Sequence, residues 1–330
     1  MKKLFTCLIC VCVMLCSVGF IACGRTYDED AVNLVAVDAN VVGLAQDIDY
    51  YVVAEPAASA KVKVIPNLNF AGSLQQLYGG NGYPQAVVVA KNGLLGSDAL
   101  TDFIDALLTS REWLLSEDVS IEHITDTINS HLTQGMEPAI KPQNLTKQVI
   151  ENCGINFVQA TAGKADIISF MEKLNSVGGG SFGMPAEDFF WDGGDSGEYT
   201  EKISVYAPDG APALGIAKAM SENNVLNAEY FIVNPNTVQA LVGGAEPKAD
   251  ICVLPVNVAV KLLGNAKNYK LVGTLTHGNL YLLSKNGEQI SADNIEKLKG
   301  STVGVVNLAA VPGLTFKVIL QSHGIGFKEQ

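Results

Sequence analysis

The sequence predicts an α/β protein whose parallel-rich sheets are flanked by helices. The chain has 330 residues, of which 48% are hydrophobic and 17% charged, and this is enough for two domains with ordinary cores. From residue 203 to residue 320, apolar strand patterns alternate with helical patterns, as they do in βαβ units. Several of these strands end in a short turn, marked by proline or glycine, that opens a helix.

The N-terminus has the features of an export signal. Residues 1–23 start with two lysines, continue with an apolar run and end with small residues before Cys23. The run FIAC resembles the bacterial lipobox, in which the cysteine is lipidated, although Phe20 stands where leucine is usual. We therefore expect a lipoprotein signal peptide over 1–23. The protein would be anchored through Cys23 at the outer face of the bacterial cytoplasmic membrane. An uncleaved anchor is the alternative, because the run is nearly long enough to span a bilayer.

Composition and motifs exclude several functions. The net charge is −12 and only two residues, Arg25 and Arg111, are arginines, so no basic surface for nucleic acid is expected. After Cys23 only Cys153 and Cys252 remain, which indicates neither a disulfide framework nor a zinc site. The chain has no G-x-S-x-G, H-E-x-x-H or P-loop motif. We therefore expect no catalytic residues, no metal and no cofactor.

The first half of the chain opens with a short polar tether at 24–30. From Ser97 to Val177, apolar residues recur at three- and four-residue spacing, which predicts a series of helices with Ser97 and Ser120 as N-caps. Strands are predicted at 31–39, from residue 48 into the turn at 53–59, and at about 85–90.

The second half follows a segment, 178–202, that is rich in glycine, serine and acidic residues, and we expect a linker at 192–202. A new α/β pattern then begins. Its strands and helices are expected, in order, within KISVYAPDG, PALGIAKAMSEN, AEYFIV, NTVQALVG, ADICVLP, VNVAVKLLG, YKLVGTLTHGNLYLLSK and SADNIEKLKG.

The chain closes with a strand at 302–307, a turn and a helix that Gly324 stops. A parallel sheet requires a further strand beside the first, and none is predicted after Gly324. We expect the strand at 31–37 to supply it, in the same sheet as 302–307 and with Gln330 near Arg25 or the tether after it.

Two strand segments resemble each other. Residues 82–93 and 278–287 each run from glycine through an apolar strand into Lys-Asn-Gly. Chance similarity is one explanation, and neighbouring strands with equivalent roles, such as two crossings between lobes, are the other.

Four strands run into turns that open helices, at 53–59, 206–214, 254–260 and 306–316. Open α/β sheets bind ligands at such strand ends, where backbone N–H groups of the helix point at the ligand. Gly210 and Gly313 would let a ligand approach the backbone closely. A single turn of this kind is ordinary βα-loop chemistry, whereas four together favour a binding cleft.

These residues also carry a family resemblance. The segments ISVYAPDGAPALGIAKAM, ADICVLPVNVAVKLLG, THGNLYLLSK, LKGSTVGVVNLAAVPGLTFKVIL, DYYVVAEPAAS and LYGGNGYPQAVVVA resemble the solute-binding lipoproteins of ABC importers, of the nitrate/sulfonate/taurine and thiamine-pyrimidine type. The resemblance covers nearly everything after the signal peptide and is specific for the family but not for the solute.

The order of the blocks departs from the family. Residues 25–191 resemble the family's second half and residues 198–330 its first half. The chain therefore looks like a circularly permuted member of the family behind an intact signal peptide. Permutation is physically reasonable, because domain termini often lie close together and exposed loops tolerate a cut. A rearranged gene whose product was never selected is the alternative.

The resemblance implies the periplasmic-binding-protein type II fold, with two α/β lobes and a ligand cleft between them. Residues 31–82 and 286–330 would form lobe II, and residues 83–285 would form lobe I. The strands near 83–90 and 279–285 would cross between the lobes.

The resemblance and the turns together give a set of candidate ligand-binding residues. Asp209 and Glu55 would accept hydrogen bonds, the N–H groups of 313–315 would hold an oxygen, and Tyr83 would stack on a planar ligand. For His277, anchoring the hinge turn is an equal alternative. The set is Asp209, Gly210, Ala211, Asn257, Thr276 and His277 in lobe I, Pro312, Gly313, Leu314, Thr315 and Glu55 in lobe II, and Tyr83 and Gln85 at the crossing.

The implied function is transport. A monomeric, lipid-anchored receptor would deliver a small solute to an ABC permease and ATPase, the solute being a sulfonate, nitrate, taurine or a thiamine-pyrimidine-like compound. No arginine lies in the four turns, which favours a neutral or aromatic solute over an oxyanion. The alternatives are an enzyme of the same superfold, similar to pyrimidine synthases but without their cysteine-rich motif, and a surface or signalling module that does not transport.

Overall fold

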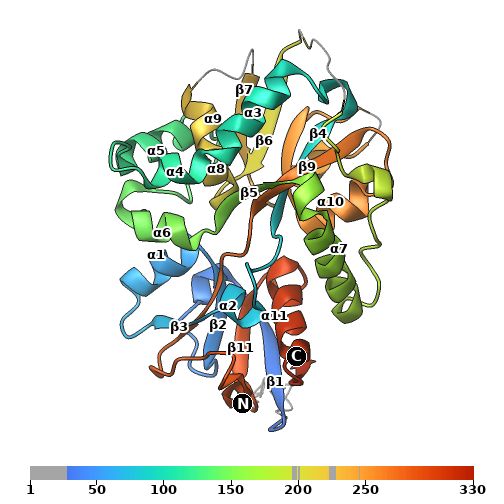
Figure 1. Ribbon diagram of the computed structural model, residues 1–330. Helices are drawn as coiled ribbons and strands as arrows, with labels where there is room; N and C mark the ends of the chain where they lie inside the picture. The colour runs from blue at the N-terminus through green and yellow to red at the C-terminus, as the bar shows by residue number, and fades with distance from the viewer. Residues whose placement is uncertain (1–27, 195–198, 200, 223–227, 245) are drawn as a thin grey trace, which may run out of the picture.

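The computed structural model describes residues 28–194, 199, 201–222, 228–244 and 246–330. The predicted signal peptide, Cys23 and the first part of the tether lie outside the described residues, as do residues 195–198 and 200 of the linker at 192–202. The predicted α/β class is confirmed, since the chain forms two mixed six-stranded sheets flanked by helices (Figure 1). We call the part of the chain built on each sheet a lobe.

Lobe II contains the sheet of strand order β12-β1-β11-β2-β10-β3. Strands β12, β1, β11 and β2 run parallel, and β10 runs antiparallel to both β2 and β3. The strands are β1 (Ala31–Val37), β2 (Tyr50–Ala54), β3 (Asn69–Ser73), β10 (Leu280–Ser284), β11 (Thr302–Val306) and β12 (Gly326–Glu329), and the helices are α1 (Ala57–Val64), α2 (Leu74–Tyr78) and α11 (Val311–Ser322).

Lobe I contains the sheet of strand order β5-β9-β4-β8-β6-β7. Its strands are β4 (Ala86–Lys91), β5 (Ile155–Gln159), β6 (Ile203–Pro208), β7 (Ala228–Val233), β8 (Ile251–Pro255) and β9 (Tyr269–Thr276). Its helices are α3 (Asp98–Leu108), α4 (Ser110–Leu115), α5 (Ile121–Asn129), α6 (Lys147–Asn152), α7 (Ala160–Val177), α8 (Ala211–Gly215), α9 (Ala217–Glu222) and α10 (Val256–Leu263). Short 3₁₀ turns lie at Ala39–Val41, Asn92–Leu94, Pro142–Asn144, Glu187–Phe189, Val238–Leu241 and Ile295–Leu298.

The local sequence explains why these elements form where they do. Strand β4 is a run of β-branched and small apolar residues that is buried on both faces, as a central strand requires. Helix α3 buries apolar residues at three- and four-residue spacing against the sheet. Ser97 and Ser120 cap α3 and α5, as predicted, because their side chains accept the N–H groups of Leu100 and His123.

The pairing of β1 with β11 is confirmed. The two strands lie side by side and parallel in one sheet, with Asn33 opposite Thr302. The expectation that no strand follows Gly324 is wrong, because β12 pairs in parallel with the other edge of β1. Strand β12 is short, mostly exposed and at the sheet edge, so its four residues carry no apolar pattern.

The C-terminal residues contact both β1 and the end of the tether. The Gln330 N–H donates to the carbonyl of Leu34 at 3.0 Å, and the Lys328 ammonium pairs with Asp28 at 2.5 Å. Arg25, the other expected neighbour of Gln330, lies outside the described residues. The two ends of the described chain therefore meet on the same face of lobe II (Figure 1).

The two look-alike strands belong to different sheets. Strand β4 lies between β8 and β9 in lobe I, and β10 lies between β2 and β3 in lobe II. The chain crosses between the lobes at 79–85 and 277–279, so the predicted boundary at 285 is wrong and β10 belongs to lobe II. Each strand follows a crossing directly and runs antiparallel to both neighbours, which explains their similar sequences.

A continuous apolar core joins the lobes on one side of the molecule. One cluster of buried side chains includes Leu34 and Val52 of lobe II and Phe170 and Leu174 of lobe I. Helix α7 packs against α11 along this seam (Figure 1). The Glu187–Phe189 turn also packs on lobe I, with Phe189 almost fully buried, so the stretch before the predicted linker is part of the core.

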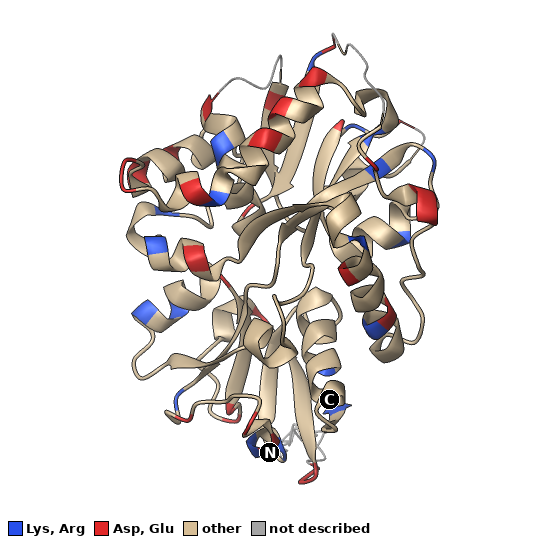
Figure 2. Cartoon of the chain, in the orientation of Figure 1, with Lys and Arg blue, Asp and Glu red and all other residues tan. Residues whose placement is uncertain are grey.

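Charged side chains lie mainly on the outer helices and loops, and the strands carry few (Figure 2). No helix within the described part of the chain is both long and apolar enough to cross a membrane.

Candidate functional site: a cleft between the two lobes

The largest cavity described, about 610 Å³, lies between the lobes. The carboxyl ends of β2 and β11 reach it from lobe II, and those of β6, β8 and β9 reach it from lobe I. In both sheets these are the ends that face the other lobe, so the turns predicted to bind ligand converge on one space (Figure 1).

Eight of the thirteen predicted site residues line this cleft, and five do not. The eight are Glu55, Gln85, Asp209, Gly210, Ala211, Asn257, Thr276 and Pro312. The five that lie elsewhere are Tyr83, His277, Gly313, Leu314 and Thr315.

Asp209 follows β6 and its carboxylate is already occupied. One oxygen accepts the N–H of Gly210 and the other accepts the N–H of Ala139, each at 2.7 Å. Gly210 has a φ of +103°, a conformation that side chains other than glycine's rarely adopt. Asp209 therefore shapes the wall of the cleft, and its predicted role as a free acceptor for the ligand is not supported.

Glu55 follows β2 and is 2% exposed. Its carboxylate accepts the N–H of Ser59 at 2.9 Å and the hydroxyl of Ser59 at 2.6 Å, which satisfies the first turn of α1. It also accepts the side-chain amide of Asn152, in α6 of lobe I, at 3.2 Å. Glu55 thus links the two lobes at the edge of the cleft and, like Asp209, has no oxygen free of a partner.

Tyr83 lies in the crossing and is fully buried. Its ring stacks on Phe170 at 5.4 Å between centroids and meets the edge of Tyr78 at 5.5 Å. Burial raises the pKa of its hydroxyl well above the usual value. The predicted stacking on a planar ligand is wrong, because the ring is buried against Phe170 of α7 and Tyr78 of α2.

His277 lies in the second crossing, where the structure favours the hinge alternative. Its backbone N–H donates to the carbonyl of Gly154 at 2.8 Å. A Cβ on Gly154 would lie 2.0 Å from the carbonyl oxygen of Gly278, so the two backbones touch here. Burial lowers the pKa of the His277 imidazole.

The start of α11 contributes less than predicted. Pro312 lines the cleft, but Gly313, Leu314 and Thr315 lie beneath it and are buried. A Cβ on Gly313 would lie 1.9 Å from the carbonyl oxygen of Leu308. Glycine is therefore needed here for the helix to pack on its own preceding turn, and not for the approach of a ligand.

Gln85 joins a network of amides at the hinge. Its side-chain N–H donates to Asn279 Oδ1 at 2.6 Å, and its Oε1 accepts the Asn279 N–H at 3.1 Å. The Asn279 side chain donates in turn to the carbonyl of Glu55 at 3.0 Å. Asn279 was missed in the sequence, although its place directly after the glycine of a look-alike segment was a usable indication.

Asn257 differs from all these groups. It lies in the first turn of α10, lines the cleft and is 6% exposed. Its side-chain Oδ1 is buried and has no hydrogen-bond partner among the described residues. Thr276, nearby at the end of β9, uses its hydroxyl oxygen to accept the N–H of Ala86 at 3.2 Å.

Two helices that open on the cleft, α10 and α11, lack side-chain caps. A missing cap is not particular to the cleft, because α4 and α7 also lack one, whereas α2, α3, α5 and α6 are capped by Ser73, Ser97, Ser120 and Thr146. The first N–H groups of a helix have no partner within it, and they favour partial negative charge. The cleft lining holds two carboxylates and no lysine, arginine or histidine.

Further lining residues were not predicted. Asn236 and Gln239 follow β7, Asn307 follows β11, and Ala139 belongs to the segment that Asp209 holds. Asn307 has a φ of +62°, which suits asparagine better than most residues. The Asn-Pro-Asn-Thr run at 234–237 carries turn residues, but nothing in the sequence indicated which side of the sheet it faces.

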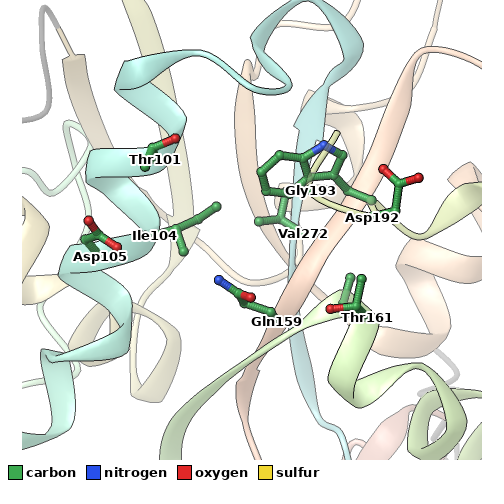
Figure 3. A pocket seen from close by; sticks show the side chains of 10 residues that line it. Thr101, Ile104, Asp105, Gln159, Thr161, Asp192, Gly193 and Val272 are labelled. Carbon is green, nitrogen blue, oxygen red and sulfur yellow. The ribbon is translucent and has the colours of Figure 1, made fainter. Parts of the chain in front are cut away.

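A second, smaller cavity of about 240 Å³ lies within lobe I (Figure 3). Helix α3 supplies Thr101 and Asp105, and Gln159, Thr161 and Trp191 complete much of the lining. No predicted site residue reaches it. Within the described ranges, no group of three or more His, Cys, Asp or Glu side chains is placed to hold a metal ion.

Comparison of the chain with protein-family models, with curated proteins and with solved structures gave no match.

Proposed function

We propose that the protein is an extracytoplasmic solute-binding lipoprotein, which captures a small organic solute in the cleft and delivers it to an ABC permease. The observation that carries the proposal is the convergence of strand ends from both sheets on one cavity of about 610 Å³. Both lobes line that cavity, and the described chain crosses between them at the segments 79–85 and 277–279. A cleft of this size suits a small molecule.

The proposed fold is the periplasmic-binding-protein type II fold in circularly permuted order. Two features support it: β1 pairs with β11 and β12 although it lies at the other end of the chain, and each sheet contains one antiparallel strand that follows a crossing. In the proposed parent order, β12 would lead into β1.

The mechanism needs no bond chemistry. A solute that contacts both lobes binds the closed arrangement better than the open one, and it shifts the population by that difference in affinity. Polar contacts already bridge the lobes: Asn152 donates to Glu55 and its backbone carbonyl accepts the hydroxyl of Tyr281 at 3.2 Å, and the Lys63 ammonium donates to the carbonyl of Gln143 at 2.5 Å. The permease would recognise the closed form of a monomer that Cys23 anchors to the membrane.

Thermal unfolding of the full chain in detergent, with a panel of sulfonates, nitrate, amino acids and pyrimidines, tests the function. A saturable rise in melting temperature without turnover, accompanied by a decrease in the radius of gyration, is expected. Formation of a product, or the lack of any stabilising solute, would contradict the proposal. Labelling with palmitate, compared between the natural chain and Cys23→Ser, tests the anchor.

A further inference from the structure

We propose that Asn257 selects the solute, and that the solute is a neutral molecule with a hydrogen-bond donor next to an acceptor. This inference rests on the proposed function, since it concerns the same cleft. It names the class of solute and one residue that determines specificity.

Four other polar side chains of the cleft, two of them buried and two half-buried, are already paired. Asp209 accepts two backbone N–H groups, and Glu55 accepts groups from Ser59 and Asn152. Gln85 and Asn279 satisfy each other in the hinge. These contacts hold the groups in fixed positions as parts of the cleft wall.

Asn257 is only 6% exposed, and its side-chain Oδ1 is buried without a hydrogen-bond partner within the described chain. Leaving a buried amide unpaired is costly, and native proteins rarely do so without a reason. A ligand that pairs with the amide removes this cost. Among the described residues that line the cleft, Asn257 is thus the buried one whose side-chain oxygen still lacks a hydrogen-bond partner.

The charged side chains of the cleft lining disfavour an anionic solute. The lining contains the carboxylates of Glu55 and Asp209 and no cationic side chain, so no side chain in it compensates the full charge of an anion. Nitrate and sulfonate also offer acceptors only, and cannot pair with the oxygen of Asn257. These properties disfavour the oxyanions that the sequence left open.

The amide of Asn257 also determines which hydrogen-bonding pattern a solute needs. A side-chain amide presents one acceptor and one donor group side by side, and such an amide pairs with an edge that carries the complementary donor and acceptor. The torsion that orients the amide is broad, so either end can turn toward a bound molecule. The Val256 N–H in the first turn of α10 donates to the carbonyl of Gln85 at 2.9 Å, and the partial positive charge of the uncapped helix start favours a further acceptor on the solute. Lactams, cyclic ureas and amino-substituted nitrogen heterocycles have this combination.

Calorimetric titration of the full chain in detergent tests the proposal with defined probes. Uracil and cytosine carry the donor and acceptor edge, 1,3-dimethyluracil lacks the donor, and nitrate and methanesulfonate carry charge without a donor. We expect uracil or cytosine to bind, dimethyluracil to bind at least about tenfold more weakly, and the anions to bind more weakly still.

Variants assign the effect to Asn257. Asn257→Leu removes both the donor and the acceptor of the amide and should weaken binding of uracil or cytosine by about tenfold or more. Asn257→Asp is nearly isosteric and is the second variant, to be used if Asn257→Leu does not fold. It should lose the preference for uracil or cytosine over dimethyluracil. Asn268→Leu, an exposed asparagine just before β9 at the end away from the cleft, is the matched control and should bind as the natural chain does.

The outcomes separate the two proposals. Unchanged affinity of either folded Asn257 variant overturns the role of this residue. Binding of nitrate or methanesulfonate in preference to every neutral probe, with closure of the lobes, overturns the solute class while leaving the receptor function intact. Binding of none of the probes overturns the solute class, and if the wider panel also fails, the function is overturned with it.

Discussion

Gly313 is the residue whose missing side chain fixes how α11 starts. The carbonyl oxygen of Leu308 occupies the place of a Cβ, at 1.9 Å, and it belongs to the backbone and cannot rotate away. We expect Gly313→Ala to lower the free energy of unfolding by about 1–3 kcal/mol, because the helix must shift off its preceding turn. Urea denaturation measures this change.

Gly93→Ala is the matched control for that substitution. Gly93 is exposed, has no heavy atom within 4 Å of its would-be Cβ and does not need a positive φ, so little change is expected. Equal stability of both variants would show that the turn before α11 yields easily.

His277 makes stability depend on pH. Burial lowers the pKa of its imidazole below the ordinary value of 6.5, so the unfolded chain takes up this proton at a higher pH than the folded chain does. Stability from this residue is therefore constant above about pH 6.5 and falls as the pH drops toward the folded-state pKa. We expect a smaller loss of stability between about pH 7.5 and about pH 5.5 in His277→Gln than in the natural chain.

The pH experiment needs the difference between two chains, because burial also lowers the pKa of His131. That residue is present in both chains and its contribution cancels. Parallel losses of stability in the natural chain and the variant would remove His277 as a cause.

At the scale of elements, a buried lysine of α11 helps to hold β12 on the lobe, beside the exposed Lys328–Asp28 pair. Lys317 of α11 is 4% exposed, and its ammonium lies 2.6 Å from the carboxylate of Glu329 in β12. Glu329→Gln would leave a buried charge without its partner, and we expect a loss of about 1–2 kcal/mol in the free energy of unfolding. Hydrogen exchange of the β12 amides should accelerate as well.

Glu151→Gln serves as the comparison, because Glu151 pairs with Arg111 at 3.1 Å on the surface and both side chains are about half exposed. Exposed pairs contribute little, so a change below about 0.5 kcal/mol is expected. If this variant loses as much stability as Glu329→Gln, burial of Lys317 is not what makes the β12 pair important.

Elements with a long or strongly apolar pattern could be predicted from the sequence. The central strands, the helices from Ser97 onward and their serine caps all follow from local rules. Strand β12 could not be predicted, because four mostly exposed residues at an edge depend on their neighbour β1 and not on their own composition. The sheet to which β4 or β10 belongs depends likewise on the strands beside it, and the similar sequences of β4 and β10 do not indicate these neighbours.

At the scale of the whole molecule, the sequence identified the ends of the strands but not the direction of each side chain. Asp209, Asn257 and Pro312 reach the cleft because their turns do. Tyr83 and Gly313 do not, because one packs in the hinge and the other under its own helix. These differences depend on contacts between distant segments, such as Tyr83 with Phe170, that no local pattern contains.

Permutation leads to a prediction about chain order. A chain that runs from residue 201 to 330 and continues through a flexible linker into 28–194 keeps every sheet pairing described here. We expect it to fold with a similar far-ultraviolet spectrum and to bind the same solutes, because packing and not chain order defines the fold. A linker of roughly ten residues, which spans up to about 33 Å, can return along β1 from Gln330 to Asp28.

The control for that experiment is a chain with the same new ends and a linker of roughly three residues, about 10 Å, which is too short for this return. Failure of the long-linker chain to unfold cooperatively would argue against a permuted parent order.

The position of β1 between β11 and β12 has a consequence for the order of events during synthesis. Asn33 of β1 bonds to Ser301, a residue 268 positions away, so the earliest strand to be made waits for nearly the last. Until those residues emerge, β1 has two open edges and lobe II can pair only β2, β10 and β3, whereas every described strand of lobe I has already been made. Lobe II is therefore the late-folding half, and a nascent chain stalled before residue 300 would hold β1 unpaired and open to chaperones or to aggregation.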